Sequence, residues 1–382
     1  MNIAFVTTYD GEDVLNWSGS SYYMSKSLKD QENNICYIGN LTRKVSWRDI
    51  IKKIRCRVFS RKDFVLDRTI AVCKEYSMQV AERLSAEKID CIISPGSMPI
   101  AYLKTDIPKI FYTDATFAGL INYYSGFTNL SPEVIRQGHI IEKQALENCD
   151  LAIYSSEWAA KTAIEFYKVN PEKVKVVPFG ANLEEYHSRE EVQTFIADRD
   201  KSVMKILFNG VDWERKGGDF VLSVVEEIRR RGIKVEINLV GARDFDSTGM
   251  PPYIVNHGFL SKSVTAEKKL LEDLYKTCHF LVVPSQAEAY GLVFCEASAY
   301  GMPSIARRTG GITSIIEEGK NGFTVDSETD IIPYADIICE YFTDQEKYST
   351  LAISSYTEFE TRLNWKAAGE SVNRMIKSVL HN

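Results

Sequence analysis

Short apolar runs alternate with longer amphipathic segments along almost the whole chain. The longer segments repeat apolar side chains at every third or fourth position, the spacing with which an α-helix buries one face. Short apolar runs bounded by polar turns are typical of strands buried in a parallel sheet. We therefore predict an α/β fold. The predicted strands are residues 3–7, 35–38, 91–93, 109–112, 151–154, 174–177, 203–208, 234–240, 254–257, 280–283, 304–306 and 319–325.

The length of the chain predicts two domains. It has 382 residues, and a single hydrophobic core stops growing at roughly 250–300 residues. Residues 183–202 are charged and turn-like, so they are the best candidate for a linker.

A strand, a loop and a helix in the second half of the chain contain the main candidate site. The apolar run 280–283 leads into a polar loop, Gly291 lets the backbone turn, and a helix follows. The first N–H groups of a helix lack internal partners and lie at the positive end of its dipole, so they favour a phosphate. Here those groups belong to Gly291, Leu292 and Val293.

Two carboxylates flank these amides. Glu288 lies in the loop and Glu296 in the helix, with seven residues between them. A phosphate repels a carboxylate, whereas sugar hydroxyls readily donate hydrogen bonds to one. Helical side chains tilt toward the N-terminus, which brings Glu296 back toward the amides. This arrangement predicts a ligand composed of sugar, diphosphate and sugar. The alternative is a pair of solvated glutamates.

The spacing of Glu288 and Glu296, bracketed by Pro-Ser, Tyr-Gly and Gly-x-Pro, resembles the Glu-x7-Glu signature of retaining glycosyltransferases of family 4. The resemblance implies that Glu288 contacts the transferred sugar and that Glu296 binds the ribose of the nucleotide. It also implies that the backbone of Tyr290, Gly291, Leu292 and Val293 holds the distal phosphate.

The same resemblance implies the GT-B fold, in which two Rossmann-like α/β domains face each other across a cleft. The acceptor-binding domain would be residues 1–184 and the nucleotide-sugar domain residues 185–362. A C-terminal helix at residues 363–382 would pack back on the first domain.

A second loop, after the predicted strand 203–208, supplies two cations. In the family, an Arg and a Lys from this loop bind the diphosphate, and Lys216-Gly217 resembles the Lys-Gly pair. The usual Arg, five residues before the Lys, is Val211 here, so we expect Arg215 to replace it. Both cations would stabilise the charge that the diphosphate gains as the glycosidic bond breaks. The alternative, a charged surface loop, suits Arg215 better than Lys216.

Two further loops resemble ligand-binding loops of the family. Gly258, Phe259 and Leu260 stand where family members hold the nucleobase. Near the N-terminus, Gly19 and Ser20 stand where a strand gives way to a helix, and the resemblance implies contact with the donor phosphate beside the acceptor. An ordinary strand-to-helix turn is the alternative for Gly19.

Asp114 follows the predicted strand 109–112, at the sheet edge where open α/β sheets bind ligands. The family often has a His in this loop beside the reacting sugar, whereas this chain has Thr113-Asp114. Asp114 would accept the proton of an acceptor hydroxyl or orient a donor hydroxyl. Its alternative role is to cap the next segment.

Composition excludes several other classes of protein. A formal net charge of -6 argues against general nucleic-acid binding, and the eight cysteines lack the Cys-x2-Cys spacing of a zinc site. Free thiols, no signal-peptide pattern and no apolar run of about 20 residues predict a cytoplasmic protein. Asp-x-Asp triplets at residues 198–200 and 244–246 lie in turn-like surroundings. We therefore expect no metal and no cofactor beyond the donor substrate.

Basic residues crowd the stretch 43–68, and apolar residues are interleaved with them at near-helical spacing. A basic amphipathic segment binds an anionic membrane surface, which would place the protein at the inner face of the membrane, or attracts an anionic acceptor. The alternative is a solvated helix that covers the domain with its apolar face.

The resemblance therefore implies a retaining glycosyltransferase that moves a sugar from a nucleotide-diphosphate-sugar donor to an acceptor hydroxyl. A nucleotide-sugar epimerase of the same fold is the first alternative, but it needs paired acid–base groups at the sugar, and only Asp114 is a candidate. A non-catalytic nucleotide-sugar binder is the second.

Overall fold

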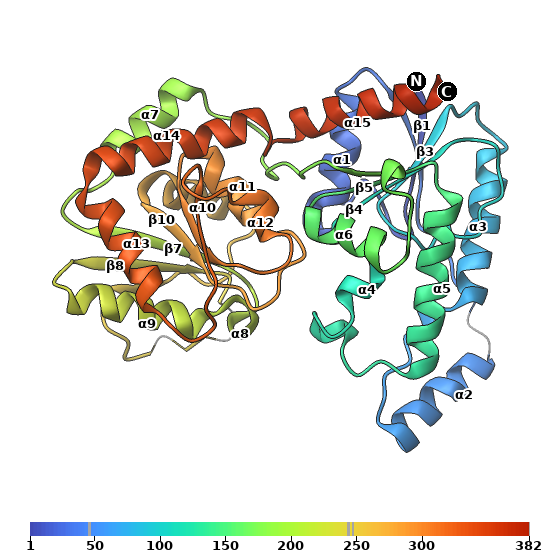
Figure 1. The fold of residues 1–382 in the computed structure, drawn as a ribbon, viewed down its shortest axis with the longest axis horizontal. Coiled ribbons are helices and arrows are strands. Elements are labelled where there is room, and N and C mark those ends of the chain that lie inside the picture. Colours follow the sequence, from blue (N-terminus) through green and yellow to red (C-terminus); the bar gives the residue numbers. More distant parts are fainter. Residues whose placement is uncertain (45–46, 243–244, 247, 382) are drawn as a thin grey trace. The chain divides into compact units, whose positions relative to one another are not determined.

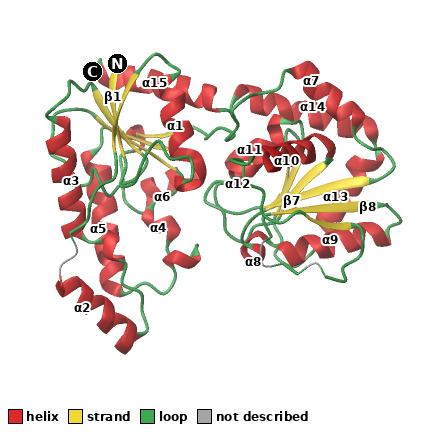
Figure 2. Ribbon diagram, turned by 180° about the vertical axis from the view of Figure 1, so that it is seen from behind, coloured by secondary structure: helices red, strands yellow, loops and turns green. Residues whose placement is uncertain are grey.

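The computed structural model describes residues 1–44, 47–242, 245–246 and 248–381, with only the backbone at Arg48. The chain forms two compact units. Unit 1 is Met1–Phe179 together with Trp365–Asn382, and unit 2 is Gly180–Asn364. Figures 1 and 2 show a sheet with helices against it in each unit. All eight cysteines are free.

Unit 1 contains a six-stranded parallel sheet in the order β2-β1-β3-β4-β5-β6. Its strands are almost entirely apolar because helices cover both faces of a parallel sheet. The strands are β1 Asn2–Val6, β2 Asn34–Ile38, β3 Cys91–Ser94, β4 Lys109–Thr113, β5 Leu151–Tyr154 and β6 Val174–Val176. The helices are α1 Ser20–Lys29, α2 Trp47–Arg55, α3 Ile70–Leu84, α4 Phe117–Leu120, α5 Pro132–Asn148, α6 Glu157–Glu165 and α15 Trp365–Leu380.

Unit 2 contains a second six-stranded parallel sheet in the order β12-β11-β10-β7-β8-β9. The strands are β7 Met204–Asn209, β8 Val235–Val240, β9 Ile254–Asn256, β10 Phe280–Val283, β11 Ser304–Arg307 and β12 Gly322–Val325. The helices are α7 Arg189–Asp198, α8 Trp213–Lys216, α9 Gly218–Arg230, α10 Thr265–Thr277, α11 Leu292–Ala299, α12 Ile312–Ile315, α13 Ile332–Thr343 and α14 Gln345–Thr361. Every predicted strand is present, and the two-domain α/β prediction is confirmed.

The prediction of a turn-like linker at residues 183–202 is wrong. Residues 189–198 form the helix α7, which buries Val192 and Ile196. A capping box starts this helix: the Ser188 side chain accepts from the amide of Glu191, and the Glu191 carboxylate accepts from the amide of Ser188. The many charged residues of this stretch led to the prediction of a loop. The Ser-x-x-Glu pattern at residues 188–191 is nevertheless a signal for the start of a helix.

The last helix, α15, belongs to unit 1 and packs on α1. Gly369 allows the close approach, because a Cβ there would lie 2.6 Å from the carbonyl oxygen of Ser27. The side-chain amide of Asn33 also donates to the side-chain oxygen of Asn373 over 3.0 Å. The chain therefore returns to unit 1 after completing unit 2.

Candidate active site

The strand order of unit 2 creates a topological switch point between β7 and β10. From β7 the chain winds outward through β8 and β9, and from β10 it winds the other way through β11 and β12. Ligands of open α/β sheets bind at the carboxyl ends of the strands beside such a point. The loops that leave β7 and β10 carry Lys216 and Glu288, and the first of them contains the short helix α8, which ends at Lys216.

These two loops contact each other directly. The amide of Gln286 donates to the carbonyl of Arg215 over 2.7 Å, and its side chain donates to the carbonyl of Glu214 over 3.2 Å. Gly217 has φ of 78°, and a Cβ there would lie 2.7 Å from the carbonyl oxygen of Pro284. The glycine of the Lys-Gly pair therefore lets the loops close on each other.

Glu288 lies at the centre of a charged group. Its carboxylate pairs with Lys216, lies 3.6 Å from Nη1 of Arg215, and accepts from the Ser285 hydroxyl over 3.5 Å. Only 8% of Glu288 is exposed. Arg215 is itself anchored, because it donates to the carbonyl of Ala287 over 2.9 Å. Three side chains that the sequence singled out are thus brought together.

The start of α11 is open. Gly291 is its N-cap with φ of 106°, and no side chain caps the helix. A Cβ at Gly291 would lie 2.7 Å from the ring of Phe294, so only glycine fits this turn. Within the described chain, the amide of Phe294 donates to the carbonyl of Gly291, whereas the amides of Leu292 and Val293 donate to no other residue. These two amides remain available to an anion.

Glu296 is almost fully buried, at 5% exposed, on the same helix. One carboxylate oxygen accepts from the hydroxyl of Tyr275 over 3.0 Å, and the other pairs with Lys262. The Tyr275 hydroxyl in turn accepts from the side-chain amide of Asn209 over 3.1 Å. Burial, followed by the charge of Glu296, raises the pKa of Tyr275 well above its ordinary value, so its hydroxyl stays a donor. The ring of Tyr300 stacks on that of Tyr275.

Asn209, Lys262 and Tyr275 were not predicted from the sequence. Tyr275 occupies an ordinary apolar position of α10, and Lys262 lies in a polar loop. Asn209 is the last residue of β7, and that position was the one available signal, because strand ends at a switch point face the ligand.

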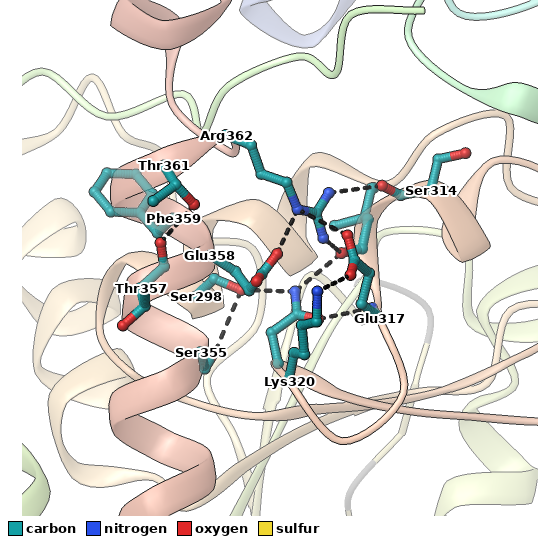
Figure 3. Close-up of polar contacts among 12 residues, drawn as sticks. Ser298, Ser314, Glu317, Lys320, Ser355, Thr357, Glu358, Phe359, Thr361 and Arg362 are labelled. Carbon is teal, nitrogen blue, oxygen red and sulfur yellow. Dashed lines mark hydrogen bonds and ion pairs between the residues drawn. The ribbon is translucent and has the colours of Figure 1, made fainter.

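Figure 3 shows a further hydrogen-bond and ion-pair network, which holds the end of α12 in place near the site. Arg362 donates to the carbonyls of Ser314 and Ile315 over 2.8 and 2.7 Å and so caps the end of α12. Its guanidinium also pairs with Glu358, and it lies 3.3 Å from Glu317. Just before α12, the amide of Gly311 donates over 3.0 Å to the carbonyl of Glu288. Arg362 therefore helps to fix the backbone beside Glu288.

The predicted nucleobase loop follows β9. Gly258 has φ of 65°, and its carbonyl accepts from the amide of Gly241, which follows β8, over 2.7 Å. Phe259 is 45% exposed and Leu260 is half-buried. The loop thus lies at the carboxyl edge of the sheet and presents an aromatic side chain to solvent.

The predicted residues of the first domain lie in unit 1. Gly19, with φ of 84°, is the N-cap of α1, and Ser20 is buried in its first turn. Trp17 and Ser18 also have positive φ, so this turn is held in an unusual conformation. Trp17 is fixed edge-on against the ring of Phe179 at 5.5 Å.

Asp114 comes directly after β4 and is half-buried. Tyr9 follows β1 at the same edge of the sheet. Burial raises the pKa of Tyr9, and the nearby carboxylate of Asp114 raises it further. Asp114 therefore lies among polar groups at the carboxyl ends of the unit 1 strands.

No group of side chains suited to a metal ion occurs in the part of the chain that the structure describes. Asp198 and Asp200 are exposed and flank the buried Arg199, whose guanidinium donates to main-chain carbonyls and to Tyr348. Asp244, in the second triplet, lies outside the described residues.

Two protein-family models match the chain. The model described as "Glycosyltransferase Family 4" matches residues 22–185, and the model described as "Glycosyl transferases group 1" matches residues 204–344. Together they include most of both units.

Similar curated proteins include D-inositol 3-phosphate glycosyltransferases. The protein from Corynebacterium diphtheriae is 24% identical over 281 residues, which are 70% of this chain and 64% of the relative. The protein from Corynebacterium jeikeium is 26% identical over 63% of this chain and 60% of its own length. The matched region thus spans less than two thirds of these relatives.

Solved structures match over the full length. The sucrose-phosphate synthase of Thermosynechococcus elongatus has a TM-score of 0.72 at 16% identity, covering 100% of this chain and 99% of the other. The Anabaena protein HepE, solved with UDP and glucose, has a TM-score of 0.63 at 16% identity, covering 99% and 100%. This likeness establishes the GT-B fold.

Proposed function

Because this chain belongs to glycosyltransferase family 4, we propose that it moves a sugar from a nucleoside-diphosphate sugar to an acceptor hydroxyl. In this proposal the transfer retains the anomeric configuration of the sugar. The observation that carries the proposal is the pair of buried carboxylates, Glu288 and Glu296, on either side of the uncapped start of α11.

Unit 2 would bind the donor. The distal phosphate accepts hydrogen bonds from the amides of Leu292 and Val293, at the positive end of α11. The ribose hydroxyls donate to Glu296, and the hydroxyls of the transferred sugar donate to Glu288. The nucleobase lies against the loop that contains Phe259.

The two cations beside Glu288 would serve the bond-breaking step. As the bond between the anomeric carbon and the phosphate oxygen breaks, the leaving diphosphate gains negative charge. Lys216 carries three N–H donors, so it can keep its contact with Glu288 and still donate to a phosphate oxygen. Arg215 lies beside the same carboxylate and adds a second positive charge.

Unit 1 would bind the acceptor at the carboxyl ends of its strands. There Asp114 receives the proton of the acceptor hydroxyl or orients a hydroxyl of the donor sugar, and Gly19 and Ser20 border the donor phosphate. The named relatives make a phosphorylated inositol the first acceptor to test, and the UDP of the named structures makes a uridine nucleotide the first donor.

A panel of nucleoside-diphosphate sugars and hydroxyl acceptors tests the proposal. We expect release of nucleoside diphosphate together with a glycosylated acceptor, and NMR of the product reports its anomeric configuration. Recovery of the donor as a different epimer supports the epimerase alternative instead. Binding without turnover across the panel supports a non-catalytic nucleotide-sugar binder.

Tyr275→Phe tests how Glu296 is held in place. The substitution removes one buried hydrogen bond, worth about 1 kcal/mol, so we expect the Kd for UDP to rise roughly fivefold. Calorimetry measures the affinity, and thermal unfolding shows whether the fold is kept. Tyr253→Phe is the matched control, because the Tyr253 hydroxyl contacts Glu226 instead. Equal UDP affinity in wild type and Tyr275→Phe would remove Tyr275 from the site.

A further inference from the structure

An exposed apolar ridge runs along α2 and the π-helical turn Cys56–Ser60 that continues it. Large apolar side chains of this segment are exposed, from 44% at Ile51 to 82% at Phe59. The ridge consists of Trp47, Ile50, Ile51, Ile54, Val58 and Phe59. Several large apolar side chains exposed on one short segment mark an interaction site.

This exposure argues against the alternative that the segment is a solvated helix that covers the domain with its apolar face. A helix that merely covers the domain would bury its apolar face, whereas here the contacts with unit 1 come from the other side. Lys52 pairs with Glu133 of α5 over 2.6 Å, and Cys56 packs against the small core cluster that contains Phe64 and Phe117. Trp47, Ile50, Ile51 and Ile54 follow helical spacing on a face away from Lys52. In Figures 1 and 2, α2 projects at one end of unit 1.

The ridge is bordered by positive charge. Between Trp47 and Lys62 the sequence has seven basic residues and a single acidic one, Asp49. Lys53, Arg55 and Arg57 are exposed like the ridge itself. An apolar stripe with Lys and Arg at its edges is the pattern of a helix that lies in a membrane interface, with its apolar side chains among the acyl chains and its cations at anionic headgroups.

We propose that the segment Trp47–Lys62 docks this protein on an anionic membrane surface. The positive border selects this occupant over a second copy of the chain, since a two-fold contact would bring two positive borders together. None of the described helices has the length and apolar character needed to cross a bilayer. Membrane docking through this segment requires neither donor binding nor sugar transfer.

Sedimentation with lipid vesicles tests the docking surface in the full chain. Wild type should sediment at low salt with vesicles that contain about 30% phosphatidylglycerol and stay in solution with pure phosphatidylcholine. Ile54→Ser combined with Phe59→Ser should reduce the bound fraction at least roughly tenfold, because both side chains are exposed and their loss removes apolar insertion. Lys53→Glu, Arg55→Glu and Arg57→Glu together should reduce it equally strongly.

The matched control places the same charge reversals elsewhere on unit 1. Lys88→Glu, Lys104→Glu and Lys143→Glu change exposed lysines outside the segment and should leave vesicle binding near wild type. Absence of wild-type binding to the anionic vesicles would overturn the proposal, and so would equal loss in the control. If the Ile54→Ser/Phe59→Ser variant binds vesicles as strongly as wild type, the ridge does not insert into the membrane. If the wild-type protein forms a dimer, and only the Ile54→Ser/Phe59→Ser variant disrupts it, the ridge would instead be a contact with a second copy of the chain.

Discussion

We expect replacement of Lys216 with alanine to lower the turnover of sugar transfer by roughly 100-fold or more, the usual effect of removing one group that stabilises developing charge. Lys216 is the cation paired with Glu288 at the switch point, and 12% of its side chain is exposed. Its loss leaves the leaving diphosphate with Arg215 alone. Steady-state kinetics with the best donor of the panel measures the effect.

Two controls separate this role from a structural one. Lys201→Ala removes an exposed lysine of the same unit and should leave turnover unchanged. Glu288→Gln keeps Lys216 while removing the charge that pairs with it, so a comparison of both single variants with the double variant isolates their coupling. Turnover of Lys216→Ala close to wild type would exclude Lys216 from the reaction.

We expect Glu296→Ala to weaken the binding of UDP by roughly 10- to 100-fold. The carboxylate is expected to accept the ribose hydroxyls, and a hydrogen bond to a charged group contributes about 1.5–3 kcal/mol. The substitution also leaves the Tyr275 hydroxyl and Lys262 without their shared acceptor. Calorimetry gives the Kd, and circular dichroism shows whether the fold is kept.

Glu296→Gln refines this test, because the amide retains the size of the side chain and one acceptor oxygen but loses the charge. We expect its affinity for UDP to fall between those of wild type and Glu296→Ala. Glu328→Ala, at an exposed carboxylate of unit 2, is the matched control and should bind UDP normally. UDP binding as tight in Glu296→Ala as in wild type would count decisively against a ribose contact.

The sequence was sufficient to predict the elements around Glu288 and Glu296. Strand, loop and helix follow one another within a short stretch there, and each has its own local signal: an apolar run, a glycine turn and a helical repeat. Lys216 was predicted for the same reason, since its loop also joins a strand to a helix. The proximity of Lys216 to Glu288 follows from the strand order, which places β7 beside β10.

The remainder of the site depends on contacts between distant residues. Tyr275 reaches Glu296 from α10, and Arg362 reaches the end of α12 from the position just after α14. No periodicity in the sequence reports such contacts, because each partner also fits an ordinary helical surface. The helix α7 could have been predicted from the sequence, because its capping box is a local signal. The high charge of residues 183–202 instead led to the prediction of a linker.

A crystal structure with bound nucleoside diphosphate would show whether the start of α11 is the phosphate site. We expect distal phosphate oxygens at roughly 2.7–3.2 Å from the amides of Leu292 and Val293, with the ribose hydroxyls on Glu296. A diphosphate bound elsewhere, with both amides still lacking an acceptor and Glu296 still held only by Tyr275 and Lys262, would contradict this expectation.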